Sequence, residues 1–563
     1  MSPAQLLSHF DRISEAPHAI PRLRRFILEL AVRGKLVDQD PMDEPAAELL
    51  KRIQTEKARL IKDGKIKELK TLAITDTGKV IYEIPSNWEL VPLGETVNSH
   101  LGGGTPSKNN SNYWDGDILW ASVKDVGKGK YIDETIDRIT EAGLTDSSSN
   151  LIPPGSLIVV TRMGLGKVSI NRVPIAINQD LRALSLSNLV SIDYHYIFFK
   201  THGFEGTGLT VKGIKVEELL NIAFPLPPLA EQHRIVAKVE ELMTLCDRLE
   251  TAQAERESRR DRLAAASLHG LNNGADPDTF RNHARFYFNR LPRLTTRLEH
   301  IQQLRQTILN LAVRGKLISQ DPKDEPASEL LKRIEVEKSR LVKEGTLTRQ
   351  KLASSAPKQL AFDCPMNWQA VNFNDVCNLV TSGSRGWAEF YSDTGPKFIR
   401  AQNIRFGRLR LEDLACVSLP KKAEGSRTQV SKSDLLIIIT GAGVTNPALL
   451  DHELGEAYVS QHVALIKPTA TSLSRWLLLC LMAPVGARAE LVERAYGAGK
   501  PGLNLDNIRF LGIPLPPLAE QQRIVAKVDE LMALCDRLEA QLTTTQIESR
   551  RLLIATLSLA ING

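Results

Sequence analysis

The chain repeats itself twice, and the positions of these repeats constrain its fold more strongly than any other feature. Residues 225–250 read PLPPLAEQHRIVAKVEELMTLCDRLE and return at 514–539 with 23 of 26 positions identical. Residues 27–64 return at 308–345 with 28 of 38 positions identical. The long segments between these blocks diverge. The chain is therefore a tandem duplication with pseudo-two-fold symmetry, and each half holds one variable segment between constant blocks.

The constant blocks carry helical patterns. Within 27–64, acidic residues beside a proline begin a helix and lysines before a glycine end it, as the helix dipole favours. After the Pro-Pro pairs, apolar residues follow the 4,3 spacing of a coiled coil. The seam runs through Ile235, Val239, Leu242, Cys246 and Leu249 towards Leu263, and through Ile524, Val528, Leu531, Cys535, Leu538, Leu542, Thr545, Ser549, Leu552, Thr556 and Leu559. We predict that these two long helices pack antiparallel as a rigid spacer. The alternative is that each packs on its own variable segment.

Short β-rich runs bounded by Gly, Pro and Asn fill both variable segments. We predict that the two segments share one α/β (α+β) fold and differ in their loops. The expected domains are 1–70 (helical), 71–228 (first variable domain), 229–345 (helical), 346–517 (second variable domain) and 518–563 (helical). Landmarks recur at matching places: Trp88 with Trp368, Thr161 with Thr440, and Gln179 with Gln461.

The composition fits a multidomain globular protein. The 563 residues are 42% hydrophobic and 25% charged, and the net charge of +6 permits a nucleic-acid partner without requiring one. No apolar run approaches the roughly 18 residues of a membrane span. The N-terminus lacks the pattern of a signal peptide, and the six cysteines form no CxxC pair. We therefore expect a cytoplasmic protein with no membrane partner.

The motifs of common enzyme sites are absent from the sequence. The Gly-Lys pairs are not followed by Ser or Thr, so no Walker A loop is present. Gly497, Gly499 and Gly502 satisfy GxGxxG but precede a predicted strand instead of following one, which removes the dinucleotide-binding context. Cys and His show no zinc spacing. The sequence favours a non-catalytic chain that binds no cofactor or metal of its own.

Several fragments, in this order and twice over, closely resemble the specificity subunit of type I restriction–modification enzymes. They are AVRGKL (31–36 and 312–317), PSNWELVPLGE (85–95), GGGTPSKNNSNYWDGDILW (102–120), AINQD (176–180) and the two PLPPLAEQ motifs. The resemblance covers essentially the whole chain. It implies that the variable segments are target-recognition domains, each reading one half of a split DNA sequence, and that the paired helices set the unread spacer.

The same resemblance implies partners. Two adenine-N6 methyltransferase subunits would dock on the helical blocks, together with restriction subunits that drive ATP-dependent cleavage. S-adenosylmethionine, ATP and Mg are expected on those partners and not on this chain.

DNA reading requires Arg or Lys for guanine, Asn or Gln for adenine, and cations for phosphates. In the second variable segment, FIRAQNIRFGRLR offers Arg400, Gln402 and Asn403 for bases and Arg405 or Arg408 for phosphate. Gln179 and Gln461 are interpreted as core landmarks, since both segments retain them. The other candidates are Ser122, Lys124, Arg162 and Lys167 in the first segment, with Lys108 and Lys500 as phosphate ligands.

Two other functions remain open at this point. One is a coiled-coil assembly scaffold that never reads DNA, and the other is an enzyme with an unrecognised site. Loss of DNA binding without loss of assembly, on replacing Arg400 and Arg405 by Ala, separates a reader from a scaffold.

Overall fold

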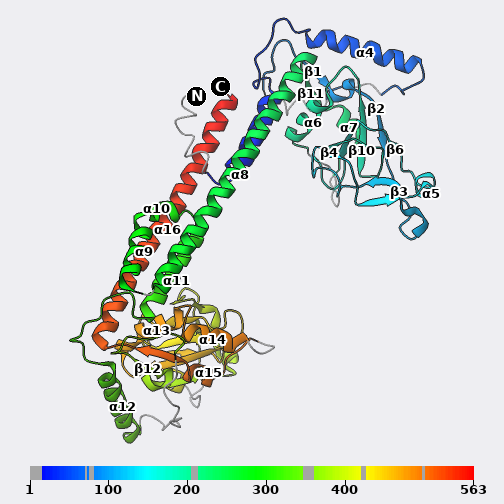
Figure 1. Ribbon diagram of the computed structural model, residues 1–563. Coiled ribbons are helices and arrows are strands. Elements are labelled where there is room, and N and C mark those ends of the chain that lie inside the picture. The colour runs from blue at the N-terminus through cyan, green and yellow to red at the C-terminus, as the bar shows by residue number, and fades with distance from the viewer. Residues whose placement is uncertain are drawn as a thin grey trace. The chain divides into compact units, whose positions relative to one another are not determined.

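The chain forms two compact units, and both contain helices and a mixed sheet domain (Figure 1). The structure, a computed structural model, describes residues 16–69, 73–74, 82–204, 213–274, 276–345, 360–383, 385–419, 426–496 and 501–562. The first unit is Met1–Arg256 with Gln546–Gly563, and the second is Glu257–Thr545. The fold class is α+β, as predicted. Most of residues 71–81 and the start of 346–517 lie outside the described residues, so those two domain boundaries stay predictions.

Domain 1 (residues 82–228) contains a five-stranded sheet of order β2-β10-β7-β8-β4 and a four-stranded sheet of order β5-β3-β9-β6. Its strands are β1 (Glu89–Pro92), β2 (Val97–Gly102), β3 (Trp114–Ala121), β4 (Tyr131–Ile132), β5 (Asp137–Ile139), β6 (Leu151–Ile152), β7 (Leu157–Val160), β8 (Val168–Asn171), β9 (Ile175–Ile177), β10 (Leu181–Leu186) and β11 (Ala223–Leu226). Its helices are η2 (Leu93–Thr96), η3 (Ser111–Tyr113), α5 (Glu141–Thr145), α6 (Ile192–Thr201) and α7 (Val216–Leu220).

Domain 2 (residues 360–517) contains sheets of order β13-β21-β18-β19 and β17-β14-β20 and a β15-β16 hairpin. Its strands are β12 (Gln369–Asn372), β13 (Cys377–Ser382), β14 (Tyr391–Ile399), β15 (Ile404–Arg405), β16 (Arg408–Leu409), β17 (Ala415–Val417), β18 (Leu435–Ile438), β19 (Pro447–Leu449), β20 (Ala457–Val459), β21 (Val463–Pro468) and β22 (Gly512–Leu515). Its helices are η4 (Phe373–Val376), η5 (Trp387–Phe390), η6 (Ala401–Asn403), η7 (Ser426–Thr428), η8 (Thr471–Leu473), α13 (Ser474–Met482), α14 (Ala487–Tyr496) and α15 (Leu505–Arg509).

The two domains share one strand framework, here called the frame, as the recurring landmarks predicted. Strand β1 pairs antiparallel with β11, and β12 pairs antiparallel with β22, so the two ends of each domain lie side by side. In each domain a helical aromatic residue donates to the second of these strands: Tyr194 Oη to the Pro225 carbonyl and Trp476 Nε1 to the Pro514 carbonyl. The Pro-Pro pair that follows cannot continue a strand ladder, and a long helix begins directly after it.

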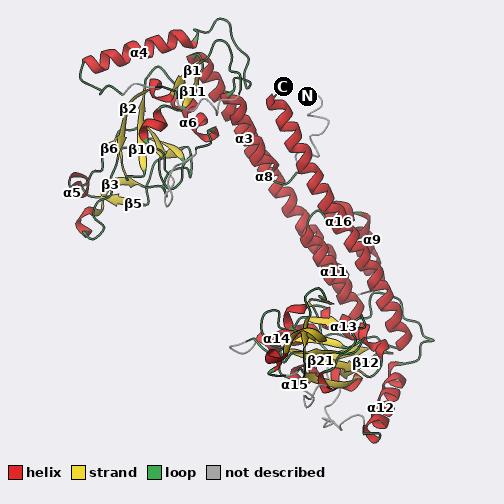
Figure 2. Ribbon diagram, turned by 180° about the vertical axis from the view of Figure 1, so that it is seen from behind, coloured by secondary structure: helices red, strands yellow, loops and turns green. Residues whose placement is uncertain are grey.

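The constant blocks fold as the predicted helices. Helices α8 and α16 are 45 residues each, about 68 Å at a rise of 1.5 Å per residue. Figure 2 shows both as unbroken ribbons. The boundaries between the two units fall inside these helices. The helices outside the domains are α3 (Ala19–Val32), α4 (Ala46–Lys62), α8 (Leu229–Asn273), α9 (Pro277–Asn289), α10 (Leu291–Leu294), α11 (Leu298–Val313), α12 (Ala327–Lys343) and α16 (Leu518–Asn562).

In the second unit, ion pairs set the direction of α11 against α16. Arg305 in the middle of α11 pairs with Asp536 at 2.7 Å and Glu539 at 2.9 Å. Asp324, beyond the end of α11, pairs with Arg523 near the start of α16. The two helices therefore run antiparallel. The first unit repeats this arrangement between α3 and α8: Arg24 pairs with Asp247 and Glu250, and Asp43 pairs with Arg234.

Helix α11 also contacts the last part of α8, but in the parallel direction. His300 lies 2.9 Å from Asp261, and Thr307 lies 3.3 Å from the amide nitrogen of Asn272. Since α11 is antiparallel to α16, the end of α8 and the start of α16 run antiparallel within this unit. This is the predicted orientation, with α11 in contact with both helices.

The buried face of the two long helices departs in places from the predicted 4,3 seam. Ile235, Val239 and Cys246 belong to a core that contains α3 and domain 1, so the start of α8 packs on its own half of the chain. Leu263 and Leu559, placed in the seam by the 4,3 spacing, are 51% and 55% exposed. Ala264, Leu268, Leu553 and Leu557 are buried instead. A straight helix drifts about 20° per heptad from a 3.5-residue repeat, so its buried face moves to neighbouring positions.

A buried carboxylate joins each domain to its long helix. Glu231, in the first turn of α8, is 0% exposed; it accepts from Trp88 Nε1 at 2.9 Å and from Gln39 Nε2 at 2.6 Å. Glu520 of α16 accepts from Trp368 Nε1 at 3.0 Å. Burial raises the pKa of Glu231, and the tryptophan bond lowers it in part. The helix N-terminus stabilises a negative charge at this position.

Replacing Trp88 by Phe removes this bond while keeping most of the ring. We expect the free energy of unfolding of domain 1 to fall by about 1.5–3 kcal/mol, the typical contribution of a hydrogen bond to a charged group. Hydrogen exchange of domain 1 amides measures it. The control is W114F, because Trp114 Nε1 donates to a neutral carbonyl, that of Ser107. An equal loss in both variants contradicts a special role for the Glu231 bond.

A buried histidine distinguishes the cores of the two domains. His195 is 0% exposed; its Nδ1 lies 2.8 Å from the Ser191 carbonyl and its Nε2 lies 2.9 Å from Thr96 Oγ1. Burial lowers the pKa of His195 to about 4. The matching positions of domain 2 hold Leu477, next to Trp476, and Val376, at the end of η4. Domain 2 therefore fills the same place with an apolar pair.

We expect the stability of domain 1 to depend on pH through His195. Its folded pKa of about 4 lies below the ordinary 6.5, so this contribution is complete above pH 6.5 and is lost as the pH falls towards 4. The loss is about 3 kcal/mol by pH 4. Hydrogen exchange of domain 1 amides at several pH values checks it. The variant H195L/T96V, which copies domain 2, removes this dependence. Burial also lowers the pKa of His100 in the same domain, so a smaller dependence can remain, but a loss as large in this variant as in the wild type contradicts the assignment.

Candidate nucleic-acid interface

Four loops of domain 1 gather where β3, β7 and β9 end. Gly104 N donates to the Ile177 carbonyl, Asn178 N donates to the Ala121 carbonyl, and Thr161 N donates to the Asp180 carbonyl. The loops are 103–108, 122–128, 161–167 and 178–180, which we call the domain 1 platform. Backbone bonds between loops far apart in sequence fix their relative positions.

The exposed charges of the domain 1 platform are all basic. They are Lys108, Lys124, Lys128, Arg162 and Lys167, whereas Asp125 and Asp180 are buried. Such a surface attracts phosphates. The structure places Lys124, Arg162 and Lys167 on neighbouring loops, with Lys108 on the first of the four loops, and their contact with DNA stays a prediction. Lys128 is a further basic residue of this surface, four residues after Lys124 in KDVGK, and it was not among the predicted residues.

Arg162 and Lys167 lie on the tip between β7 and β8. Met163 at φ 59°, Gly164 at φ 151° and Gly166 at φ 87° shape this turn. Glycine at these last two positions accepts backbone conformations that strain other residues and allows close approach to a ligand. Arg162 is half exposed, and its Nε lies 3.8 Å from Asp180. The guanidinium is thus oriented and still accessible.

Ser122 has a structural place and does not present a hydroxyl to DNA. Its side chain is buried, and its N and Oγ both donate to Asp125, at 2.9 and 3.1 Å. The backbone N–H of Lys124 donates to Ser122 Oγ. Ser122 therefore holds the turn that presents Lys124, and direct base contact is not supported. As a polar residue on a platform loop, Ser122 resembles a DNA-reading residue in the sequence. The contacts that occupy its side chain come from its own loop.

In domain 2, the corresponding loops lie at the strand ends that match those of domain 1. Ser460 N donates to the Ile399 carbonyl, the counterpart of the bond between Asn178 and Ala121. Arg400 is half-buried, lies over the Tyr391 ring at 5.6 Å and donates to the Asp413 carbonyl at 3.3 Å. We call residues 383, 385–386, 400–408, 440–446 and 460–462 the domain 2 platform. Its exposed charged side chains are Arg385, Arg405 and Arg408, and none of its described residues is an exposed carboxylate.

Asn403 does not meet the expectation of a base-reading residue. It is 1% exposed; its Oδ1 accepts from Arg400 N at 3.0 Å, and its Nδ2 donates to the Asp413 carbonyl at 3.2 Å. Its amide is engaged in shaping the loop, so a base contact is not supported. Gln402, one residue earlier, is exposed.

The β15-β16 hairpin presents the arginines expected to contact phosphates. Arg405 and Arg408 face each other across it, and both are exposed. Arg405 donates to the Gln402 carbonyl at 2.8 Å, which orients its guanidinium. Arg410 differs, because Glu412 and Asp413 pair with it at 3.3 and 2.8 Å. Lys500 lies outside the described residues.

Two expectations about the landmarks need correction. Gln179 and Gln461, predicted to be core residues, are both exposed. Thr161 does not match Thr440: Leu181 pairs with Val160, and Val463 pairs with Ile438, so Thr161 corresponds to Ile439 and Arg162 to Thr440. Sequence spacing alone cannot detect a one-residue offset between two diverged strands. The exposed Thr440 and His462 are therefore platform residues that the sequence analysis missed.

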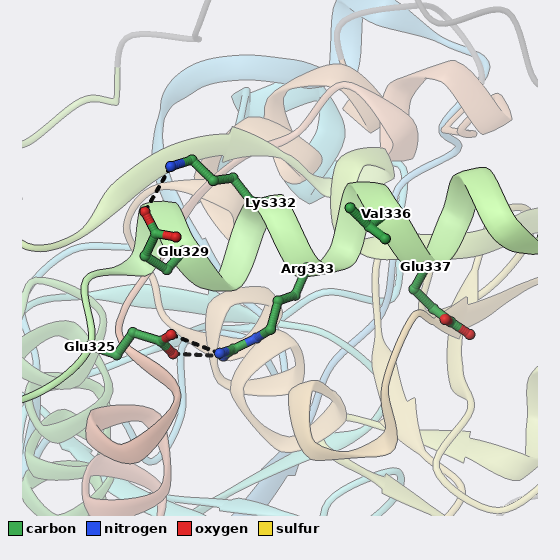
Figure 3. A pocket seen from close by; sticks show the side chains of 6 residues that line it. All are labelled: Glu325, Glu329, Lys332, Arg333, Val336 and Glu337. Atoms are coloured by element: carbon green, nitrogen blue, oxygen red, sulfur yellow. Dashed lines mark hydrogen bonds and ion pairs between the residues drawn. The ribbon is translucent and has the colours of Figure 1, made fainter.

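A hollow of about 370 Å³ lies on α12 and does not resemble a ligand site (Figure 3). Arg333 pairs with Glu325 and Lys332 pairs with Glu329, both at 2.7 Å, so these charges neutralise one another. Among the described residues no group of His, Cys, Asp and Glu is arranged to hold a metal ion. No helix in the described part of the chain is long and apolar enough to cross a membrane.

Comparisons with known proteins agree with this geometry. The family model described as the type I restriction modification DNA specificity domain matches residues 85–257 and 365–549, once over each domain and the start of its long helix. Two relatives from Escherichia coli, the specificity subunits of the type I restriction enzymes EcoAI and EcoEI, are each 30% identical over 97% of this chain and 94% of their own length.

Among solved structures, this chain is similar to the HsdS subunit from Thermoanaerobacter tengcongensis. It is 19% identical, with 86% of this chain and 100% of that chain covered and a TM-score of 0.44. The repeated domains, their basic platforms and the near full-length similarity to known specificity subunits lead to one conclusion. The chain belongs to the family of DNA specificity subunits of type I restriction–modification systems.

Proposed function

We propose that the chain recognises a bipartite DNA target, with one half-site read by domain 1 and the other by domain 2. The observation that supports this most is the pair of basic platforms at matching strand ends of two domains with one frame. The frame is shared, but the loops differ: domain 1 offers Lys124, Arg162 and Lys167, and domain 2 offers Arg405 and Arg408. Two versions of one frame with different loops suit the reading of two different half-sites.

Helices α8 and α16 are proposed to set the unread spacer between the half-sites. The proposal further includes two methyltransferase subunits and the restriction subunits as partners, docked on the helical blocks. S-adenosylmethionine, ATP and Mg would be bound by those partners. The chain itself is proposed to be non-catalytic and to act in the cytoplasm, where DNA is found and where its six unpaired cysteines would stay reduced.

Removing a phosphate contact weakens binding at every sequence alike. We expect K167A in domain 1 and R408A in domain 2 each to reduce affinity roughly fivefold to tenfold and to lower the slope of log K against log salt by about 1. The measurement is a salt titration of DNA binding by the chain with its methyltransferase partner.

The matched controls for this test are R172A and R410A. Arg172 is exposed but paired with Asp133, and Arg410 is exposed but paired with Glu412 and Asp413. We expect no change in the salt slope for either control. Equal effects in test and control variants would argue for a scaffold that does not bind DNA through these platforms.

Deleting the gene tests the bipartite reading in the cell. We expect one split adenine-methylation motif with a fixed gap to disappear from the genome, because the methyltransferase loses its reader. Sequencing of modified bases with and without the gene measures it. Replacing only the domain 1 coding segment by that of a relative should change one half of the motif and leave the other half intact. A change in both halves contradicts the assignment of one half-site to each domain.

A further inference from the structure

Gln179 and Gln461 occupy one structural position in two domains that otherwise differ. Ala121 pairs with Ile177, and Ile399 pairs with Val459, two residues before each glutamine. Leu181 pairs with Val160, and Val463 pairs with Ile438, two residues after it. The register is therefore set from both sides, and the two glutamines are equivalent in space within their own domains. Both side chains are exposed on the platforms.

The residues around the glutamines change between the domains. Next to Gln179 is Asp180, which lies 3.8 Å from Arg162. At the same two positions in domain 2, His462 Nδ1 lies 2.6 Å from Thr440 Oγ1. In domain 1 the nitrogen-bearing side chain of the pair is Arg162, which follows β7. In domain 2 it is His462, which follows β20. Ser122 is likewise replaced by Arg400. The glutamine is thus a polar side chain that both domains keep, while the residues around it differ.

Folding does not account for the retention. A glutamine kept for structure would make the same contacts in both domains. Instead, Gln179 Oε1 accepts from Thr105 Oγ1 at 2.5 Å, whereas Gln461 Nε2 lies 3.3 Å from His462 Nε2. Their exposure also rules out a shared role in the core. The backbone beneath them is tightly packed: a Cβ on Gly103 would lie 1.7 Å from the Ile177 carbonyl oxygen, and one on Gly383 would lie 2.2 Å from that of Ser460.

A carboxamide at a DNA interface matches one base in particular. Its oxygen accepts from adenine N6 and its nitrogen donates to adenine N7, which forms a bidentate pair in the major groove. We propose that Gln179 and Gln461 each bind an adenine, so that both half-sites contain an A·T pair at the equivalent position while the neighbouring base pairs differ. This inference rests on the proposed bipartite reading and adds what the two half-sites share.

The test combines protein variants with a modified base. The chain in complex with its methyltransferase partner binds a duplex that carries the target motif found by modification sequencing. Adenines of each half-site are replaced one at a time by 7-deazaadenine, which lacks the N7 acceptor. We expect one adenine in each half-site to weaken wild-type binding about tenfold when replaced. Q179A should weaken binding of the parent duplex about 10- to 100-fold.

The decisive result is which adenine loses its sensitivity to replacement in each variant. In Q179A, the sensitive adenine of the domain 1 half-site should become insensitive to 7-deaza replacement, while the one in the other half-site stays sensitive. Q461A should show the reverse. Q369A is the control, because Gln369 is exposed on β12, outside the platform, and we expect wild-type behaviour from it.

Three outcomes would overturn the inference. They are unchanged affinity in Q179A and Q461A, an equal weakening on target and non-target DNA, and full retention of adenine sensitivity in both variants. Failure of the proposed function is distinguishable, since wild-type complex would then not prefer the bipartite duplex over a duplex lacking both half-sites.

Discussion

The buried carboxylates Glu231 and Glu520 are the interactions on which the arrangement of each half of the chain depends. Each lies in the first turn of a 45-residue helix and accepts from the tryptophan that precedes the domain's first strand. A buried charge is tolerated only where donors and a helix N-terminus compensate for lost water. The need for these donors ties domain, helix and constant block into one unit. It also explains why the sequence around PLPPLAEQ is retained in both copies.

In each domain the platform lies at the ends of buried central strands. Strands β7 and β18 consist entirely of Val, Leu and Ile, and β7, β8 and β18 are buried along their whole length. Such strands give the loops a rigid base. The loops can then change residue by residue. The pairs Arg162–Asp180 and Thr440–His462 illustrate this: same positions, different chemistry, unchanged backbone register.

Exposure and charge pairing separate the arginines and amides that remain accessible from those that are engaged within the protein. Arg410 is neutralised by its neighbours, whereas Arg408 is not paired by any carboxylate in the same hairpin. Asn403 and Gln402 are adjacent in sequence, yet one shapes the loop and the other faces solvent. A dense run of polar residues therefore contains two kinds of side chain, and only their surroundings tell them apart. The same holds for Ser122 beside Lys124.

The sequence by itself determined the duplication, the α+β class, the long helices and the basic character of the loops, because repeats and periodicity are local properties of the chain. Only the tertiary structure decided that Asn403 is buried, that Gln179 and Gln461 are exposed, that Thr161 matches Ile439, and that the first part of the α8 seam packs on α3 and domain 1. Each of these depends on contacts between segments far apart in sequence. Burial is set by those neighbours, and neither residue type nor spacing carries that information.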